Sequence, residues 1–210
     1  MTRGFPLLLD VEDRLVVIVG GGSVAARKAK GLLAAGATRI RCVAPAFCDD
    51  LPGRVERFIG EYTPQCLDGA GLAFAATDCH DVNNAVVRDA RRRGVLVCRA
   101  DADDAEPGDF STPATLVDGQ VLITVSTGSP ALAAALRDDL RPRIHRRFVL
   151  MAEAMAILRP EIRGSRLAPA MRAQLFRDLA GAEALAIVDA GGLAALRDWL
   201  AQHYPELIHG

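Results

Sequence analysis

The sequence is poor in aromatic residues and lysine, has no strong excess of either charge and lacks a long uncharged apolar run. Aromatic residues make up 5% of the 210 residues, only two residues are lysines, and the formal net charge is −1. General nucleic-acid-binding proteins usually have a basic excess, so we expect no nucleic-acid partner. No apolar stretch reaches the ~20 residues that a membrane-spanning helix needs, so we expect no membrane partner.

Paired cysteines are also missing. The five cysteines, at 42, 48, 66, 79 and 98, form no C-x-x-C pair, and the four histidines share no spacing with them that suits a metal. We therefore expect reduced thiols and no metal site. The first apolar run is only four residues long before Asp10, so we expect no signal peptide and a cytoplasmic protein.

The first half of the chain alternates apolar runs with helical patterns, which is typical of βαβ units around a parallel sheet. Gly36 and Gly94 follow the two helical patterns and mark their ends. We expect strands at Arg14–Val19, Arg39–Ala44, Val55–Ile59, Leu72–Ala76 and Val95–Ala100, and helices at Ser23–Ala35 and Asp81–Arg93. The fold class is therefore α/β, a Rossmann-type doubly wound parallel sheet.

The pattern changes after about residue 111. Two apolar runs, 114–116 and 121–125, flank Asp118-Gly119, a strong hairpin signal. Ser129-Pro130 opens a helix to about Ile144, which Pro142 bends or ends, and the pattern is helical from 148 onward. We expect three parts: a dinucleotide-binding domain at 1–111, a hairpin-containing segment at 112–147 and a small helical C-terminal domain at 148–210.

Gly20-x-Gly22-x-x-Ala25 follows the first strand and opens the first helix, the context that a dinucleotide-binding motif requires. Gly20 permits the turn, Gly22 lets the backbone approach a pyrophosphate, and Ala25 allows close packing. The helix N-terminus, with Ser23 as its expected cap and Val24 in its first turn, offers N–H groups to the anion.

The acidic residue that usually binds the ribose is absent from the end of the second strand, which reads Val43-Ala44-Pro45-Ala46. We expect the backbone at Pro45 and Ala46 to contact the ribose instead, and the choice between NAD and NADP stays open. Thr77, Asp78 and Asn83 follow the fourth strand and are expected on the nicotinamide side, although helix capping explains Asp78 equally well.

Several longer segments resemble one family. They are FPLLLDVEDRLVVIVGGGSVAARKAKGLLAAGA near the start, AFAATD at 73–78, GDFSTPA at 108–114 and VSTGSPALAAALRDDL at 125–140. In this order they resemble the siroheme synthase N-terminal family, the precorrin-2 dehydrogenases, some of which are also sirohydrochlorin ferrochelatases and thus lyases. Residues 148–210 resemble the helical domain of that family only in general character.

The resemblance implies an NAD-dependent oxidoreductase that converts precorrin-2 to sirohydrochlorin. It also implies a homodimer in which the segment 112–147 reaches across to the partner, with the active site in the cleft between domains. In family members that chelate, ferrous iron is a further substrate.

The family's catalytic residue is an aspartate just after the fifth strand. Counting from that strand gives Asp101, and counting back from Gly108-Asp109-Phe110 gives Asp103. We favour Asp101 because strand ends are better fixed than loops. A pKa raised by partial burial would suit a carboxylate that takes a proton beside a nicotinamide.

A tetrapyrrole substrate carries many carboxylates, so the resemblance also points to groups that would bind them. Arginines, namely Arg99 and those from Arg137 to Arg147, are candidates for pairing with these carboxylates. The loop Ser126-Thr127-Gly128-Ser129 offers hydroxyls and helix N–H groups to the same side chains, although helix capping explains its hydroxyls equally well.

Three other functions remain open. One is a dehydrogenase that leaves chelation to a separate enzyme. Another is a nucleotide-sensing regulatory module, because small Rossmann domains also gate transport proteins. The third is a protein of a haem or cobalamin branch that binds a tetrapyrrole without oxidising it. A sensor has no need for the GDFSTPA and STGSPAL segments, so these favour the enzyme.

Overall fold

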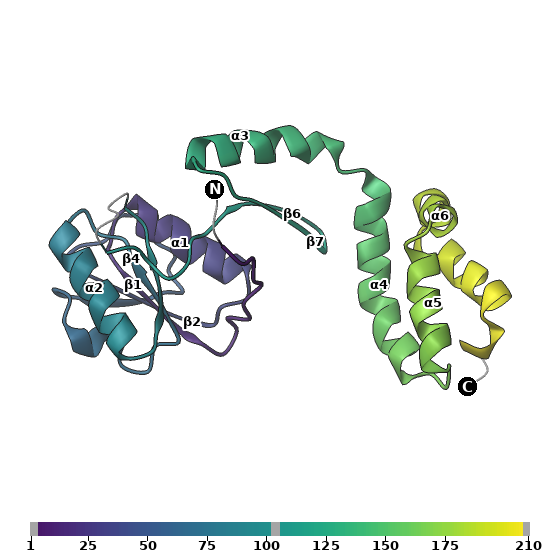
Figure 1. Cartoon of the computed structure of the whole chain (residues 1–210), viewed down its shortest axis with the longest axis horizontal. Coiled ribbons are helices and arrows are strands. Elements are labelled where there is room, and N and C mark those ends of the chain that lie inside the picture. Colours follow the sequence, from purple (N-terminus) through teal and green to yellow (C-terminus); the bar gives the residue numbers. More distant parts are fainter. Residues whose placement is uncertain (1–3, 102–105, 208–210) are drawn as a thin grey trace. The chain divides into compact units, whose positions relative to one another are not determined.

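The computed structural model describes residues 4–101 and 106–207, and the chain divides into two compact units, residues 3–112 and residues 113–210 (Figure 1). Each unit has its own hydrophobic core. The boundaries that we expect at 111/112 and 147/148 stay predictions, and the units are described separately below.

The first unit is a five-stranded parallel sheet in the order β3-β2-β1-β4-β5. Every residue of the central strand β1 is buried, as the continuous apolar run predicts for a strand covered on both faces. The strands are β1 (Leu15–Val19), β2 (Arg39–Ala44), β3 (Glu56–Ile59), β4 (Leu72–Ala75) and β5 (Leu96–Arg99).

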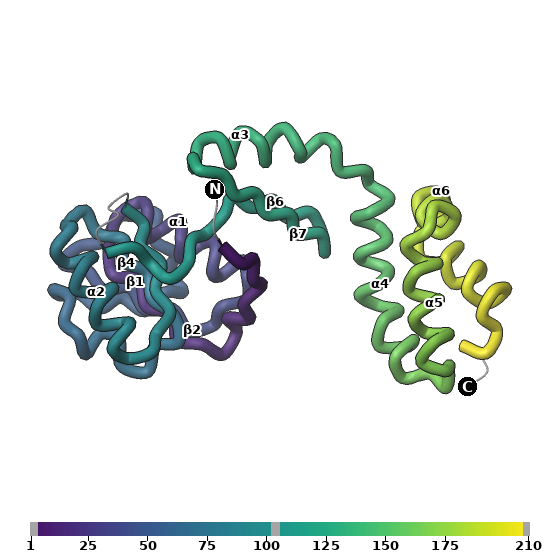
Figure 2. The backbone as a smooth tube through the Cα atoms, viewed as in Figure 1, coloured from purple at the N-terminus to yellow at the C-terminus, as the bar shows by residue number. Residues whose placement is uncertain are grey.

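Two helices cover opposite faces of this sheet: α1 (Ser23–Ala34) and α2 (His80–Arg92) (Figure 1). Alternate residues of β1 enter different cores: Ile18 packs in the α1 core, and Val17 packs in the α2 core. A short 3₁₀ helix, η1 (Pro64–Leu67), leads into β4. Figure 2 follows this path along the backbone. The predicted doubly wound α/β fold is therefore confirmed.

Local boundaries differ slightly from expectation at the first helix. The N-cap of α1 is Gly22 rather than Ser23, and it makes no side-chain capping hydrogen bond. The C-cap is Ala35, and Gly36 follows it with φ of +92°. Gly22 has φ of −85° and ψ of −170°, extended angles that any residue adopts, so α1 begins without a side-chain cap and without a need for glycine at this position.

The second unit begins with an antiparallel hairpin, β6 (Ala114–Asp118) and β7 (Val121–Val125). Gly119 and Gln120 form its two-residue turn, and Gly119 has φ of +53° at the first central position, where glycine is favoured. The predicted helix after Pro130 ends earlier than expected: α3 spans Pro130–Leu140, and Pro142 lies in a 3₁₀ turn, η2 (Arg141–Arg143).

Helices α4 (Arg146–Gly164), α5 (Pro169–Leu179) and α6 (Ala182–His203) pack against one another, and a 3₁₀ turn, η3 (Pro205–Leu207), follows (Figure 1). Helix α6 breaks at Gly192, where φ is +64°. In the described part of the chain, no single helix is long and apolar enough to cross a membrane; only α5 and α6, bent by 64°, pass that test as a pair.

Candidate active site

The carboxyl ends of four neighbouring strands lie in register at one edge of the sheet. Val19 at the end of β1 pairs with Val43 on one side and Ala75 on the other, and Ala75 pairs with Arg99 of β5. Strands β2 and β3 lie on one side of β1, whereas β4 and β5 lie on its other side. The strand order therefore reverses between β1 and β4. Open α/β sheets bind ligands at such a switch point.

Two glycines hold the loop after β1 close to its neighbours. A Cβ at Gly20, where φ is +137°, would lie 2.3 Å from the carbonyl oxygen of Ala76. A Cβ at Gly21 would lie 1.9 Å from the carbonyl oxygen of Ala46, and the Gly21 carbonyl accepts a hydrogen bond from the Cys48 N–H at 2.8 Å. The loops after β1, β2 and β4 therefore touch, and both glycines are required for the fold itself.

Gly22 differs from these two glycines. A Cβ at Gly22 would meet no atom of the described chain within 4 Å, so this side of the loop is open. Gly22 and Ser23 are exposed, Val24 is half-buried, and Ala25 is buried in the α1 core. The first turn of α1 has no acidic residue, so its N–H groups and partial positive charge suit an anion. The loop fits the pyrophosphate of a dinucleotide.

The other predicted cofactor residues lie at the same edge. Pro45 and Ala46 are exposed just after β2, while Thr77 is half-buried and Asp78 is exposed just after β4. Farther along the chain after β2, the Asp50 carboxylate lies 3.7 Å from Lys30 Nζ on α1. The structure thus brings the predicted backbone contacts of both nucleotide arms to the same edge of the sheet.

Asn83 ties the loop after β4 to the loop after β5. Its side chain is fully buried, its amide nitrogen donates to the Thr77 carbonyl at 3.0 Å, and its amide oxygen accepts from the Thr77 N–H at 3.2 Å. The same amide nitrogen donates to Asp101 Oδ2 at 3.1 Å. Burial of an amide is favourable only when it is hydrogen-bonded, as here.

Asp101 lies just beyond β5, with its side chain 18% exposed. The Arg99 guanidinium donates from Nε to Asp101 Oδ1 and from Nη2 to Oδ2, the latter at 2.9 Å. These hydrogen bonds, helped by Asn83, outweigh burial and lower the pKa of Asp101 to about 2. Our expectation of a raised pKa is wrong, because partial burial was considered without the neighbouring arginine. Asp103, the alternative catalytic residue, lies outside the described residues.

Sequence reasoning missed His80 as a member of this site. Its Nδ1 lies 2.9 Å from Asp101 Oδ2, and its side chain is 65% exposed. His80 is the first residue of α2, directly after the β4 loop. The available signal was its place between the carboxyl end of β4 and the start of α2, but we considered histidines only as metal ligands.

Arg99 has a different environment from the one expected of a substrate-binding residue. Its side chain is only 2% exposed, and besides Asp101 its guanidinium donates to Asn84 Oδ1 at 2.5 Å and to the Glu106 carbonyl at 3.1 Å. It therefore fixes the residues around Asp101 to α2 and to the segment that follows. Its substrate-binding role stays a prediction.

The Gly108-Asp109-Phe110 motif holds the chain against β5. A Cβ at Gly108 would lie 2.6 Å from the Arg99 nitrogen, so only glycine permits this approach. The Asp109 carboxylate accepts from the Val97 N–H at 3.1 Å, and the Phe110 ring meets the Phe74 ring edge-on, with centroids 5.6 Å apart. The motif thus stabilises the segment that leads away from Asp101.

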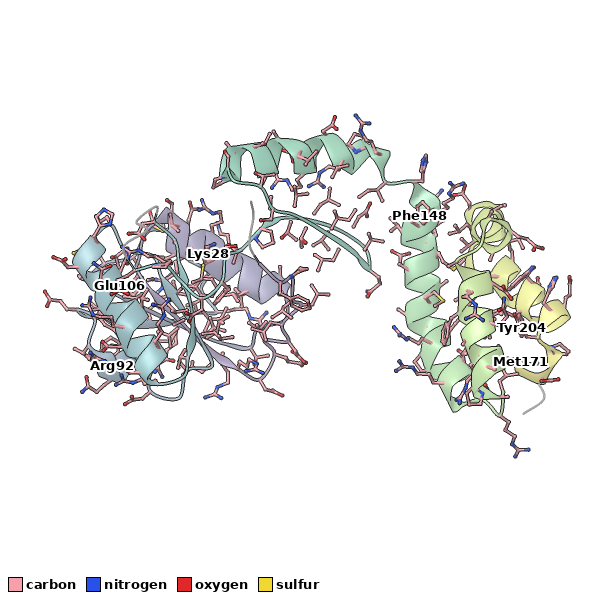
Figure 3. All side chains as sticks on the ribbon, viewed as in Figure 1. Lys28, Arg92, Glu106, Phe148, Met171 and Tyr204 are labelled. Carbon is pink, nitrogen blue, oxygen red and sulfur yellow. The ribbon has the colours of Figure 1, made fainter. Side chains whose placement is uncertain are left out.

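Lys28, in the glycine-containing segment 20–29, also holds the chain after β5 close to the sheet. It projects from α1 (Figure 3), donates to Thr112 Oγ1 and lies 5.8 Å from the centre of the Phe74 ring. Burial lowers its pKa. Two of the four segments that carry the resemblance, the one near the start and residues 108–114, therefore contribute to the architecture around the site.

The loop from Ser126 to Ser129 belongs to the second unit. Thr127 Oγ1 donates to the Ser129 carbonyl at 2.6 Å, and Ser129 caps α3 by accepting from the Leu132 N–H at 3.4 Å. Ser126 and Gly128 are exposed. The capping interpretation of Ser129 is confirmed, and the role of this loop in substrate binding stays a prediction.

Comparison with known proteins agrees with this geometry. A family model described as "Putative NAD(P)-binding" matches residues 7–114. The chain is 41% identical over 147 residues to the siroheme synthase of Chromobacterium violaceum, covering 67% of this chain and 31% of the relative. It is 30% identical over 203 residues to siroheme synthase 3 of Aeromonas hydrophila, covering 93% of this chain and 43% of the relative. The chain thus spans about a third of the length of the curated relatives that it matches most strongly.

Among solved structures, the chain is similar to SirC, a precorrin-2 dehydrogenase, with a TM-score of 0.73 and 22% identity over 95% of this chain and 98% of that one. This likeness confirms the fold, including the hairpin and the helical region after the sheet.

The sheet order, the glycine loop at the switch point and the open face at Gly22 define a Rossmann-type dinucleotide-binding domain. The chain belongs to the family described as "Putative NAD(P)-binding", and its predicted relationship to the siroheme synthase N-terminal family is confirmed.

Proposed function

We propose that this protein is an NAD-dependent precorrin-2 dehydrogenase that forms sirohydrochlorin in siroheme biosynthesis. The observation that carries the proposal is the position of Asp101, at the same sheet edge as the glycine loop and one strand beyond the β4 loop. The proposal is supported by the names of its relatives, which are siroheme synthases, and by that of SirC.

The residues of the first unit have distinct tasks in this proposal. The N–H groups that follow Gly22 bind the pyrophosphate, and the loops at Pro45, Ala46, Thr77 and Asp78 contact the two nucleoside arms. A bound NAD supplies the acceptor for the hydride that leaves precorrin-2. Asp101, with Asp103 as the alternative, is the carboxylate on which dehydrogenation depends.

The substrate's carboxylates would be bound by Arg99, by the loop Ser126–Ser129 and by arginines between Arg137 and Arg147. Two of these, Arg137 and Arg143, pair with Asp138 and Asp139 in the structure, and both pairs are exposed enough to exchange with a ligand.

A homodimer is part of the proposal, with the segment 112–147 as its contact. One face of the hairpin supports it: Val117 and Leu122 are directly paired across the strands and are 62% and 44% exposed. The opposite face, which includes the buried Leu116, packs on α3. Isolated two-stranded hairpins are marginal in water, so a partner covering the exposed face would stabilise this one.

The proposed location is the cytoplasm, because all five cysteines are free thiols, as expected in a reducing compartment. Ferrous iron is proposed as a second substrate, inserted into sirohydrochlorin. Within the described residues no cluster of three His, Cys, Asp or Glu is arranged to hold a metal ion.

The proposal is tested by mixing the protein, NAD and enzymatically generated precorrin-2 and recording absorbance at the NADH band and in the tetrapyrrole region. NADH and sirohydrochlorin should appear together, and NADP in place of NAD tests the cofactor preference. Ferrous ion added afterwards should change the spectrum to that of siroheme if the chain also chelates. Folded protein that forms no NADH with either cofactor would contradict the dehydrogenase proposal.

A further inference from the structure

A cavity in the helical part of the second unit lies apart from the residues that the proposed reaction uses. Its volume is about 440 Å³, within the usual range for small-molecule sites. It is lined by the end of α5, the start of α6 and the end of α6. A straight helix of 22 residues would be about 33 Å long, so both ends of α6 line one cavity only because this helix breaks at Gly192.

Aromatic rings from the end of α6 form one wall of the cavity. The Trp199 ring stacks on the His203 ring, with centroids 4.6 Å apart, and its centroid lies 6.2 Å from that of Tyr204. Tyr204 directly follows α6 and lies beside α5 (Figure 3). The faces of tryptophan and tyrosine rings are electron-rich and attract cations.

Two carboxylates lie on this wall, and neutral groups hold both of them. Glu183 Oε1 accepts from the Trp199 indole N–H at 3.2 Å. Asp178 Oδ2 accepts from the Tyr204 hydroxyl, and Asp178 Oδ1 accepts from the Gln174 amide at 2.7 Å. These donors, above all the Tyr204 hydroxyl, lower the pKa of Asp178, so this carboxylate is charged at neutral pH. Neither carboxylate forms an ion pair with another residue of the described chain.

The helix ends around the cavity add to its negative character. Helix α5 ends at Leu179 and α6 ends at His203, so the carbonyl ends of two helices adjoin the cavity, against one N–H end at the start of α6. Arg177 is the arginine of the lining, and its guanidinium donates to the Gln174 side-chain oxygen at 3.2 and 2.6 Å. The cavity therefore combines an aromatic wall with an excess of negative over positive groups.

We propose that this cavity binds a small organic cation, an ammonium group carried on a compact apolar body. The ammonium group lies at Asp178 and Glu183, and the apolar body packs against the aromatic wall. This inference goes beyond the proposed function and does not rest on it. Precorrin-2 carries many carboxylates, which Asp178 and Glu183 would repel, so the cavity is a separate site from that of the tetrapyrrole.

The test uses the full chain, whose only tryptophan is Trp199, so tryptophan fluorescence reports on this cavity. The protein is titrated with three molecules that share one ring: cyclohexylammonium, the neutral cyclohexanol and the anion cyclohexanecarboxylate. We expect a saturable change with cyclohexylammonium, a dissociation constant at least about tenfold higher for cyclohexanol, and no saturation with the carboxylate. Isothermal titration calorimetry at the same ionic strength repeats the measurement without using the fluorophore.

Two variants assign the binding to the carboxylates. Glu183→Gln keeps an acceptor for the Trp199 N–H, and Asp178→Asn keeps one for the Tyr204 hydroxyl, so each removes a charge and retains the local hydrogen bond. In each variant the dissociation constant for cyclohexylammonium should rise about threefold or more, while that for cyclohexanol should not change. Glu153→Gln, at an exposed position of α4 outside the cavity lining, is the matched control and should bind as wild type does.

Three results would overturn the proposal. The first is equal affinity of the wild type for cyclohexylammonium and cyclohexanol, because the site would then select only an apolar body. The second is wild-type affinity for cyclohexylammonium in both folded carboxylate variants. The third is no binding of cyclohexylammonium up to ~10 mM by either fluorescence or calorimetry.

Discussion

The side-chain amide of Asn83 joins the loop after β4 to the loop after β5, because its nitrogen lies 3.1 Å from Asp101 Oδ2 while the same amide is bonded to Thr77. The two partners lie on adjacent strand ends, yet Asn83 itself comes from helix α2. One buried amide therefore fixes the distance between a proposed cofactor contact and a proposed reaction centre.

Asn83→Ala should lower the free energy of unfolding by about 1–3 kcal/mol, the usual cost of leaving buried polar partners unsatisfied. Activity should fall further than this loss of stability explains, because Asp101 and Thr77 lose their common partner. Urea unfolding and steady-state kinetics measure the two effects. Gln202→Ala, at an exposed amide on α6, is the control and should change the unfolding free energy by less than ~0.5 kcal/mol. Equal stability of both variants would contradict the role given to Asn83.

The low pKa of Asp101 predicts how stability changes in acid. The pKa is about 2 in the folded protein and near the ordinary value of ~3.9 in the unfolded chain, so the charged carboxylate favours folding. This contribution is complete above about pH 4 and is lost as the pH falls from about 4 to 2. Asp101→Asn removes it, and its unfolding free energy should change less steeply over that range than that of wild type. Parallel curves from urea unfolding at each pH would contradict the assigned ionisation.

Substitutions at two neighbouring glycines of the loop after β1 should affect different properties: stability at Gly21 and NAD affinity at Gly22. Gly21→Ala places a Cβ 1.9 Å from the Ala46 carbonyl oxygen, so the backbone must shift and the melting temperature should fall by several degrees or more. Gly22→Asp meets open space, so the protein should fold normally, but its charge opposes the pyrophosphate and NAD affinity should fall at least tenfold. Calorimetry and NAD titration of both variants check this. Unchanged NAD affinity in a folded Gly22→Asp protein would exclude this loop as the pyrophosphate site.

The sequence allowed the sheet and the glycine loop to be predicted because each is encoded locally. A strand buried on both faces is a continuous apolar run, as in Leu15–Val19, and a loop that must approach a phosphate closely requires glycine at fixed spacing. The electrostatics of Asp101 could not be predicted in this way. They depend on Asn83, 18 positions away, and on Arg99, whose side chain is buried although arginine is mostly a surface residue.

The exposed face of the hairpin provides the last prediction. Val117 and Leu122 lie opposite each other and have large apolar side chains that are 62% and 44% exposed, and the flanking pair on the same face is Thr115 and Thr124. If a second copy covers this face, Val117→Lys should place a charge in the contact and raise the dimer dissociation constant by at least tenfold, because desolvating an unpaired charge costs several kcal/mol. Analytical ultracentrifugation measures this shift. Thr124→Ser, a small change on the same face, should leave the association unchanged. A wild-type protein that is monomeric at micromolar concentration, or a Val117→Lys variant that dimerises as wild type does, would place the contact elsewhere.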